Sequence, residues 1–78
     1  MSVYHRGTGE AEGFSYVWDV FRDEGRRYIA RVAANGPNNE HMSVTRDLER
    51  RPSDRTACEQ ACIELLPRLI RTLKMIPK

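Results

Sequence analysis

The chain of 78 residues has only two cysteines, Cys58 and Cys62, four positions apart. In a helix, residues at this spacing lie one turn apart on the same face. A disulfide within one regular turn would need distorted geometry, and a zinc site would have to be completed by His5 and His41. We therefore expect two buried, reduced cysteines, and neither a metal nor any other cofactor.

Long apolar runs are also missing. No stretch approaches the roughly 20 residues of a membrane-spanning helix, and the N-terminus lacks the basic start and apolar stretch of a signal peptide. The sequence therefore predicts a cytoplasmic protein without membrane contact. A chain of this length forms one small domain that buries only about 60% of its unfolded surface, so we expect a thin core.

The sequence carries none of the residue patterns that enzymes use. Glycines 7, 9 and 13 precede the first predicted strand and open no helix, so they do not form a phosphate loop. No Ser-His-Asp, Cys-His or paired-carboxylate arrangement has support in the sequence, and a domain this small has little volume for a pocket. We therefore predict a protein that is not an enzyme.

Lysine is scarce, because eleven of the thirteen basic residues are arginine. The planar fork of arginine suits carboxylate or phosphate better than the point charge of lysine does. The net charge is only +2, so basic and acidic residues are too evenly balanced to indicate nucleic-acid binding by themselves.

Two neighbouring segments have the period-two alternation of strands, residues 14–22 and 26–32. Between them, Asp23-Glu24-Gly25 is typical of a three-residue hairpin loop with Gly25 in the left-handed conformation. This loop predicts a register that pairs Arg22 with Arg26, Val20 with Tyr28, Trp18 with Ala30 and Tyr16 with Val32.

The rest of the chain completes a small α+β domain. Residues 1–13 hold three glycines and little periodicity, which predicts a flexible arm, with Ser2 to His5 as an alternative short edge strand. Residues 35–39 break the chain, and residues 41–48 alternate again as a third strand.

After Pro52, the sequence predicts a helix capped by Ser53 or Asp54. Pro67 interrupts the helical pattern and predicts a kink or a break. Apolar side chains recur every three or four residues in one stripe: Ala57, Cys58, Ala61, Cys62, Leu65, Leu69, Leu73 and Ile76.

The predicted fold class is therefore α+β: a three-stranded antiparallel meander followed by one long C-terminal helix packed on one face. Residues 14–78 form this β-β-β-α domain. The helix stripe is expected to cover one set of strand residues: Tyr16, Trp18, Val20, Tyr28, Val32, Met42 and Val44.

One helix covers only one face, so the other face of the sheet is expected to meet water or a partner. The predicted register sets Phe21 opposite Arg27, Asp19 opposite Ile29, and Val17 opposite Arg31. Apolar residues bordered by arginine suit a protein interface. The alternative is that Asp19 pairs diagonally with Arg27 or Arg31 and that the three apolar residues are scattered without function. The predicted partner-binding residues are Val17, Asp19, Phe21, Arg27, Ile29 and Arg31.

A second basic cluster lies in residues 46–55. Its arginines suit phosphate or an acidic partner. Because Asp47, Glu49 and Asp54 lie among them, a solvated charged loop is the alternative. The residues of this cluster are Arg46, Arg50, Arg51 and Arg55.

The segment EGRRYIARV, residues 24–32, resembles the G-x-Y-x-A-R-V hairpin of the DNA-binding domain of phage integrase arms and plant apetala-type factors. The resemblance implies a three-stranded sheet in the major groove. It places Arg27, Arg31 and Thr45 near bases, and Arg46, Arg50 and Arg51 near phosphates. Asp19 and Asp47 depart from that pattern, because they put negative charge on the same face.

The size, the strand order and the absence of a catalytic site are similar to those of small phage anti-CRISPR proteins. That resemblance implies an inhibitor that binds the protein surface of a Cas complex. We therefore predict a non-enzymatic protein-binding module, of this phage type or a homodimer joined through its open sheet face. DNA binding through the sheet is the alternative.

Overall fold

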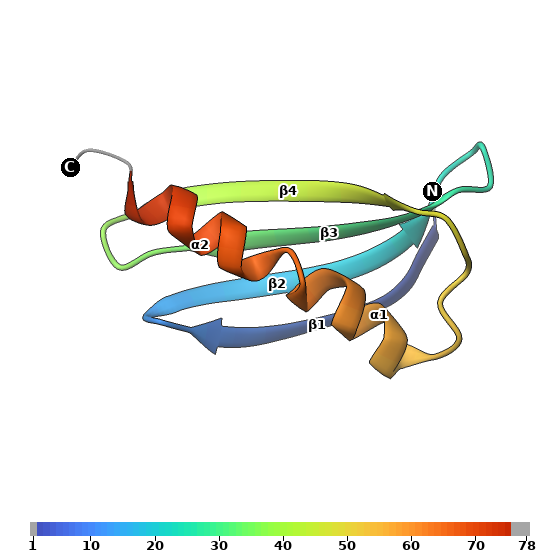
Figure 1. The fold of residues 1–78 in the computed structure, drawn as a ribbon, viewed down its shortest axis with the longest axis horizontal. Coiled ribbons are helices and arrows are strands. Elements are labelled where there is room, and N and C mark those ends of the chain that lie inside the picture. Colours follow the sequence, from blue (N-terminus) through green and yellow to red (C-terminus); the bar gives the residue numbers. More distant parts are fainter. Residues whose placement is uncertain (1, 76–78) are drawn as a thin grey trace.

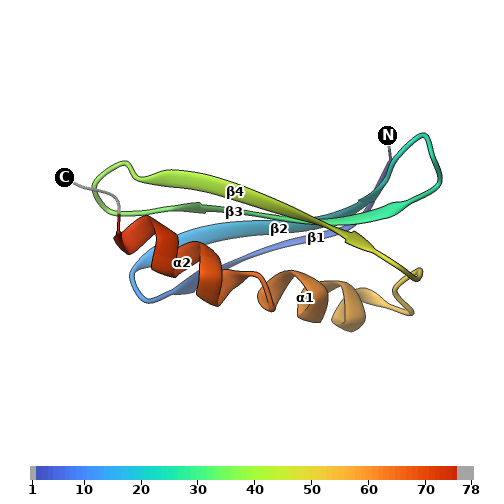
Figure 2. The ribbon, with the colours of Figure 1, turned by 45° about the horizontal axis from the view of Figure 1, so that its top comes forward.

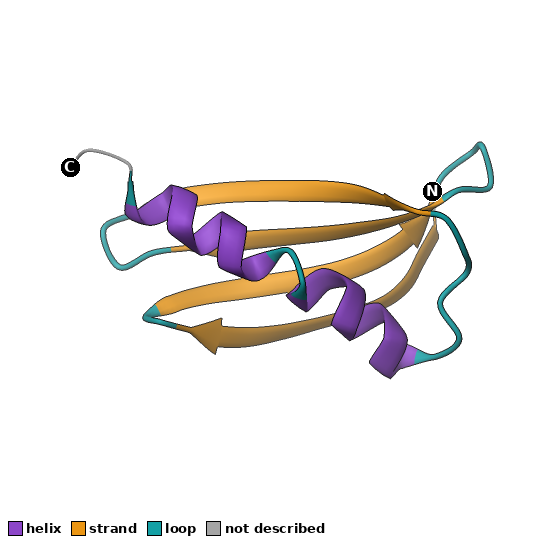
Figure 3. Cartoon of the chain, viewed as in Figure 1, coloured by secondary structure: helices purple, strands orange, loops and turns teal. Residues whose placement is uncertain are grey.

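The computed structural model describes residues 2–75. Within them the chain forms a four-stranded antiparallel sheet and two helices (Figures 1 and 3). The elements are β1 (Ser2–Ala11), β2 (Phe14–Arg22), β3 (Tyr28–Asn35), β4 (His41–Leu48), α1 (Arg55–Ile63) and α2 (Leu66–Lys74). The sheet order is β1-β2-β3-β4, so each strand pairs with its neighbour in the chain. The predicted three-stranded sheet is therefore wrong.

The additional strand, β1, occupies most of the predicted flexible arm and pairs with β2 along its length. Its glycines have a packing role. Gly7 lies opposite Trp18 and Gly9 opposite Tyr16, and a Cβ atom on Gly7 would come within 2.6 Å of the Trp18 indole nitrogen. The rings of Trp18 and Tyr16 therefore lie over β1 at Gly7 and Gly9. Aromatic side chains that cover glycines of an edge strand in this way help to fix the strand register.

The turn between β1 and β2 consists of Glu12 and Gly13, both with positive φ, at 51° and 84°. Two such residues match the twist of the flanking strands and make the tightest hairpin connection. The Lys74 ammonium lies 2.8 Å from a Glu12 carboxylate oxygen and joins the end of α2 to this turn.

The β2–β3 hairpin is closed one residue later than predicted. The Asp23 carboxylate accepts a hydrogen bond from the Arg27 amide at 2.9 Å, and the Asp23 amide donates to the Arg27 carbonyl at 3.0 Å. Asp23 therefore starts the turn, as aspartate often does, and Arg26, with φ of 63°, takes the left-handed position predicted for Gly25. The register moves by two residues and pairs Trp18 with Val32 and Val20 with Ala30. Because the shift is even, every side chain keeps its predicted face.

Arg26→Gly is expected to raise the free energy of unfolding by about 0.5–1 kcal/mol. The left-handed conformation costs a non-glycine residue about 1–2 kcal/mol, and the greater chain entropy of glycine in the unfolded state offsets part of the gain. Urea unfolding measures the change. Arg22→Gly, at the last residue of strand β2, is the matched control and should lower stability instead. Equal effects of the two variants would contradict the turn geometry.

The core lies between the sheet and the helices. Trp18, Val20 and Val32 are buried as predicted, and the other predicted strand residues, Tyr16, Tyr28, Met42 and Val44, are partly buried against them. The helices contribute buried residues from both segments: Cys58, Cys62, Leu66, Leu69, Ile70 and Leu73.

The predicted single helix is bent into two segments. The Asp54 carboxylate caps α1 by accepting a hydrogen bond from the Ala57 amide at 2.8 Å, as predicted for Ser53 or Asp54. The break falls at residues 64 and 65, and Pro67 lies in the first turn of α2, where a proline needs no amide partner. Ile76 and the rest of residues 76–78 lie outside the described residues.

Both helices lie on the same side of the sheet and cross it diagonally (Figures 1 and 2). Helix α1 packs against β1, β2 and β3, whereas α2 packs against β3 and β4. Within residues 2–75, the opposite face of the sheet carries no helix, as predicted (Figure 2). We call it the open face.

Candidate functional site

The open face is built from side chains of all four strands, arranged in rows by the strand register. The central row contains small side chains only: Thr8, Val17, Ala33 and Ser43. On one side of it lies a charged row of Arg6, Asp19, Arg31 and Thr45, and beyond that a row of Val3, Phe21, Ile29 and Asp47.

The apolar residues of the open face differ widely in exposure. Val17 is 40% exposed and Val3 is 52% exposed, while Ile29 is partly buried. Phe21, predicted to be bare, is only 8% exposed. It pairs with Val3 and Ile29 on the neighbouring strands, and the Arg31 guanidinium lies 5.1 Å from its ring centroid. The prediction that Phe21 is bare is therefore wrong, because neighbouring strands and an arginine cover it.

Asp19 and Arg31 form the best-defined ion pair of this face. Arg31 donates from Nε to Asp19 Oδ1 at 3.0 Å and from Nη2 to Oδ2 at 2.6 Å. The Asp19 side chain is 3% exposed and that of Arg31 is 42% exposed. The hydrogen bond to Asp19 raises the pKa of Arg31. The two residues face each other directly, in contrast to the predicted pairing of Asp19 with Ile29 and Arg31 with Val17, and Asp19 is not an exposed binding residue.

Arg27 is also paired with acidic residues. Its guanidinium lies 3.4 Å from an Asp47 carboxylate oxygen and 3.9 Å from one of Asp23. Arg27 and Asp47 are exposed, and Asp23 is partly buried. The two arginines that the DNA-binding resemblance places near bases, Arg27 and Arg31, are therefore engaged with aspartates of the same chain.

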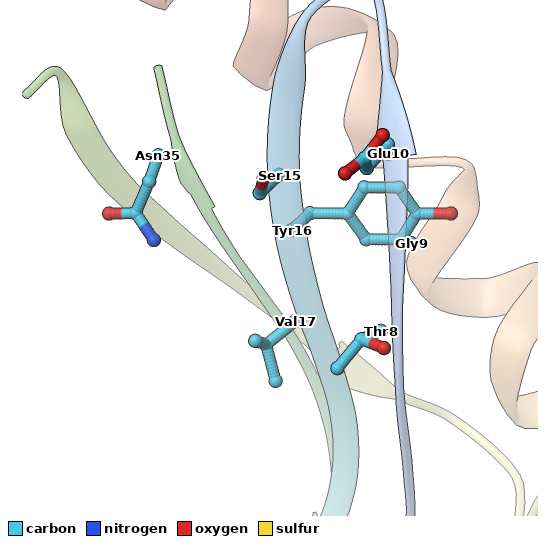
Figure 4. A pocket seen from close by; sticks show the side chains of 7 residues that line it. All are labelled: Thr8, Gly9, Glu10, Ser15, Tyr16, Val17 and Asn35. Atoms are coloured by element: carbon cyan, nitrogen blue, oxygen red, sulfur yellow. The ribbon is translucent and has the colours of Figure 1, made fainter. Parts of the chain in front are cut away.

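A shallow hollow of about 290 Å³ lies beside Val17, towards the β1–β2 turn (Figure 4). Figure 4 shows Val17 and Thr8 side by side along one edge of it, and the Tyr16 ring lying across β1 at Gly9. Glu10, Ser15 and Asn35 complete its lining. This part of the open face therefore consists of small side chains beside a shallow hollow that would admit one protruding side chain.

The second predicted cluster is spread over β4, the following loop and α1. The Arg55 guanidinium lies 5.2 Å from the Trp18 ring centroid and so lies over the edge of the core. Arg46 pairs with Glu64 at 3.3 Å, and Arg51 donates to the Tyr4 hydroxyl at 3.4 Å. Arg50 is exposed. The cluster thus divides: Arg55 packs over the core, and the others border a cleft beside α1.

Cys58 and Cys62 are free and buried, as predicted. Burial raises the pKa of both thiols, that of Cys62 to about 11. Both are therefore protonated at neutral pH, the form in which cysteine is a poor nucleophile and metal ligand. Within residues 2–75 no three His, Cys, Asp or Glu side chains gather as a metal site.

Sequence reasoning missed the open-face residues of β1, because it assigned these residues to an arm. They include Val3, Arg6 and Thr8. A signal was present: Glu12-Gly13 has the two-residue length and the glycine of a tight hairpin turn. The alternating glycines 7 and 9 concealed the strand, because they take the positions that apolar side chains normally occupy.

No helix within residues 2–75 has the length and apolar character needed to cross a membrane. The chain matches no known protein family, no curated protein and no solved structure.

Proposed function

We propose that this chain is a small, non-enzymatic protein-binding module that takes a protein partner on its open face. The supporting observation is the central row of Thr8, Val17, Ala33 and Ser43, which has an exposed valine at its centre. Small side chains across four strands make a flat surface, and an exposed apolar centre bordered by polar groups is the usual pattern of a protein interface.

The charges of the open face favour a protein partner over DNA. Arg31 is neutralised by Asp19, and Arg27 by Asp23 and Asp47. A DNA-binding surface needs several cations free to reach phosphates or bases. The proposal places the partner in the cytoplasm, where free thiols such as Cys58 and Cys62 stay reduced. The resemblance to small phage inhibitors makes a Cas complex one partner to test.

Val17→Arg is expected to weaken partner binding about tenfold or more, since it places a charge at the centre of the interface. Val17 is exposed, so the fold should survive; near-ultraviolet circular dichroism of Trp18 checks this. Sedimentation measures self-association, and affinity capture from cell extract followed by mass spectrometry measures binding of other proteins. Gln60→Arg, on the exposed side of α1, is the matched control.

The proposal requires an association that Val17→Arg removes and Gln60→Arg retains. Retention in both variants would place the interface elsewhere, and its absence from the unmodified chain would contradict binding by this face. Titration with duplex DNA at several salt concentrations tests the alternative. Binding that weakens steeply with salt and survives Val17→Arg would favour DNA.

A further inference from the structure

The diagonal course of the helices leaves one corner of the helix-covered face without a helix. This corner lies at the end of β4. Helix α2 covers the other end of β4, and α1 lies over β1 and β2 (Figure 1). The loop from β4 to α1 curves around this corner (Figure 1). Residues of this loop, β4 and α1 line an open cleft of about 450 Å³. That volume is within the range of about 300–1,000 Å³ typical of small-ligand pockets.

One wall of this cleft is apolar, and the side chains that α1 contributes to it are small. Ala57 and Ala61 lie one turn apart on α1, and Leu48 and Pro52 line the cleft from β4 and the loop. The neighbouring inward positions of α1 are Cys58 and Cys62, which are fully buried. Because Ala57 and Ala61 are small, the cleft retains apolar space that larger side chains would fill. This space is open to solvent.

Three arginines border the same space: Arg46, Arg50 and Arg51. Tyr4 positions Arg51, because its hydroxyl accepts a hydrogen bond from Nε at 3.4 Å and its ring centroid lies 5.4 Å from the guanidinium carbon. Among the described residues, the terminal amino groups of Arg51 have no hydrogen-bond partner. These groups form the fork that binds a carboxylate through two parallel hydrogen bonds.

Two carboxylates, Asp47 and Glu49, also border the cleft. Asp47 is paired with Arg27, and Arg46 with Glu64. Arg50 and Arg51 are left to face Glu49, so the rim has an excess of positive charge. An apolar wall beside a positive rim complements a ligand that carries an aliphatic group and an anionic group close together.

We propose that this cleft binds the C-terminus of a peptide, with an aliphatic last side chain against Ala57 and Ala61 and the terminal carboxylate on Arg50 and Arg51. The site is separate from the central row of the open face, because Ala57 and Ala61 lie on α1, on the helix-covered side of the sheet. Asp47, at the edge of the sheet, belongs to both surfaces. It is therefore a second binding site, and it does not depend on the function proposed above.

The test is a nuclear magnetic resonance titration of the full ¹⁵N-labelled chain with a short peptide that ends in alanine and leucine. The free-carboxylate peptide should shift the amide signals of Leu48, Ala57 and Ala61. The same peptide with an amidated end should bind about tenfold more weakly, because it lacks the charge that the arginines recognise. Inorganic phosphate should bind more weakly than the free peptide, because it lacks the aliphatic group.

Two kinds of variant separate charge from shape. Arg50→Gln with Arg51→Gln should weaken peptide binding about tenfold or more, while the control pair Arg22→Gln with Arg68→Gln, outside the cleft, should leave it unchanged. Ala61→Leu should block the cleft without altering charge, and Ala57→Val provides the same test if the first variant fails to fold. No shifts at these amides, equal binding of the amidated peptide or phosphate, or full binding by the filled variants would overturn the proposal.

Discussion

Gly7→Ala is expected to lower the free energy of unfolding by about 2–3 kcal/mol, the upper part of the range for overpacking a core. The added Cβ would lie 2.6 Å from Trp18 Nε1 and 2.7 Å from two carbons of the same ring. Trp18 is 2% exposed, and the Arg55 guanidinium lies 5.2 Å from its ring. The indole cannot move aside without disturbing the core, so either β1 or the ring must shift.

Urea unfolding, followed by the fluorescence of Trp18, measures the change in the free energy of unfolding. Gly25→Ala is the matched control, because its Cβ would meet Asp23 Oδ1 at 3.4 Å, an ordinary contact, and its φ is not positive. We expect this control to change stability by less than about 0.5 kcal/mol. If the two alanine variants were equally stable, β1 would not pack against Trp18, and the prediction of a flexible arm would return.

Arg31→Met is expected to lower the free energy of unfolding by about 2–3 kcal/mol. The variant leaves the Asp19 carboxylate, 3% exposed, without its bidentate partner. Breaking a fully buried ion pair from one side costs about 3–5 kcal/mol. The expected cost of Arg31→Met is smaller, because the Arg31 side chain is 42% exposed and water reaches Asp19 once the arginine is removed.

A double-mutant cycle tests whether the cost arises from the unpaired charge. Asp19→Leu combined with Arg31→Met should be more stable than Arg31→Met alone, since it removes the isolated carboxylate. Arg27→Met is the control for the loss of an exposed pair and should cost less than about 1 kcal/mol. A double variant as unstable as the sum of the two single ones would show that the pair has no mutual coupling.

The faces of the strands could be predicted from the sequence, while the number of strands and the register could not. Alternation from Phe14 to Arg22 determines which side chains lie together, and an even shift in register preserves that assignment. The hairpin closure depended on the hydrogen bonds between Asp23 and Arg27, which composition does not reveal. Strand β1 depended on Trp18 and Tyr16 covering glycines, a contact between two separate segments.

In the candidate site, too, the sequence pattern predicted which face a side chain lies on but not whether neighbouring residues cover it. Val17 was predicted to be exposed and is exposed. Phe21 lies on the same predicted face but is covered, because an arginine lies over its ring and an unpredicted strand flanks it. Periodicity gives the direction of a side chain, but its accessibility depends on the length and position of its neighbours.

The meander connectivity has a consequence for how quickly the molecule forms. Each pair of neighbouring strands in the sheet is also consecutive in the sequence. Strand pairing can therefore start at a short turn and extend away from it, and no pairing requires contact between distant segments. Little loop-closure entropy is lost at each step. The low mean sequence separation of these pairings predicts faster folding than that of a Greek-key sandwich of similar length.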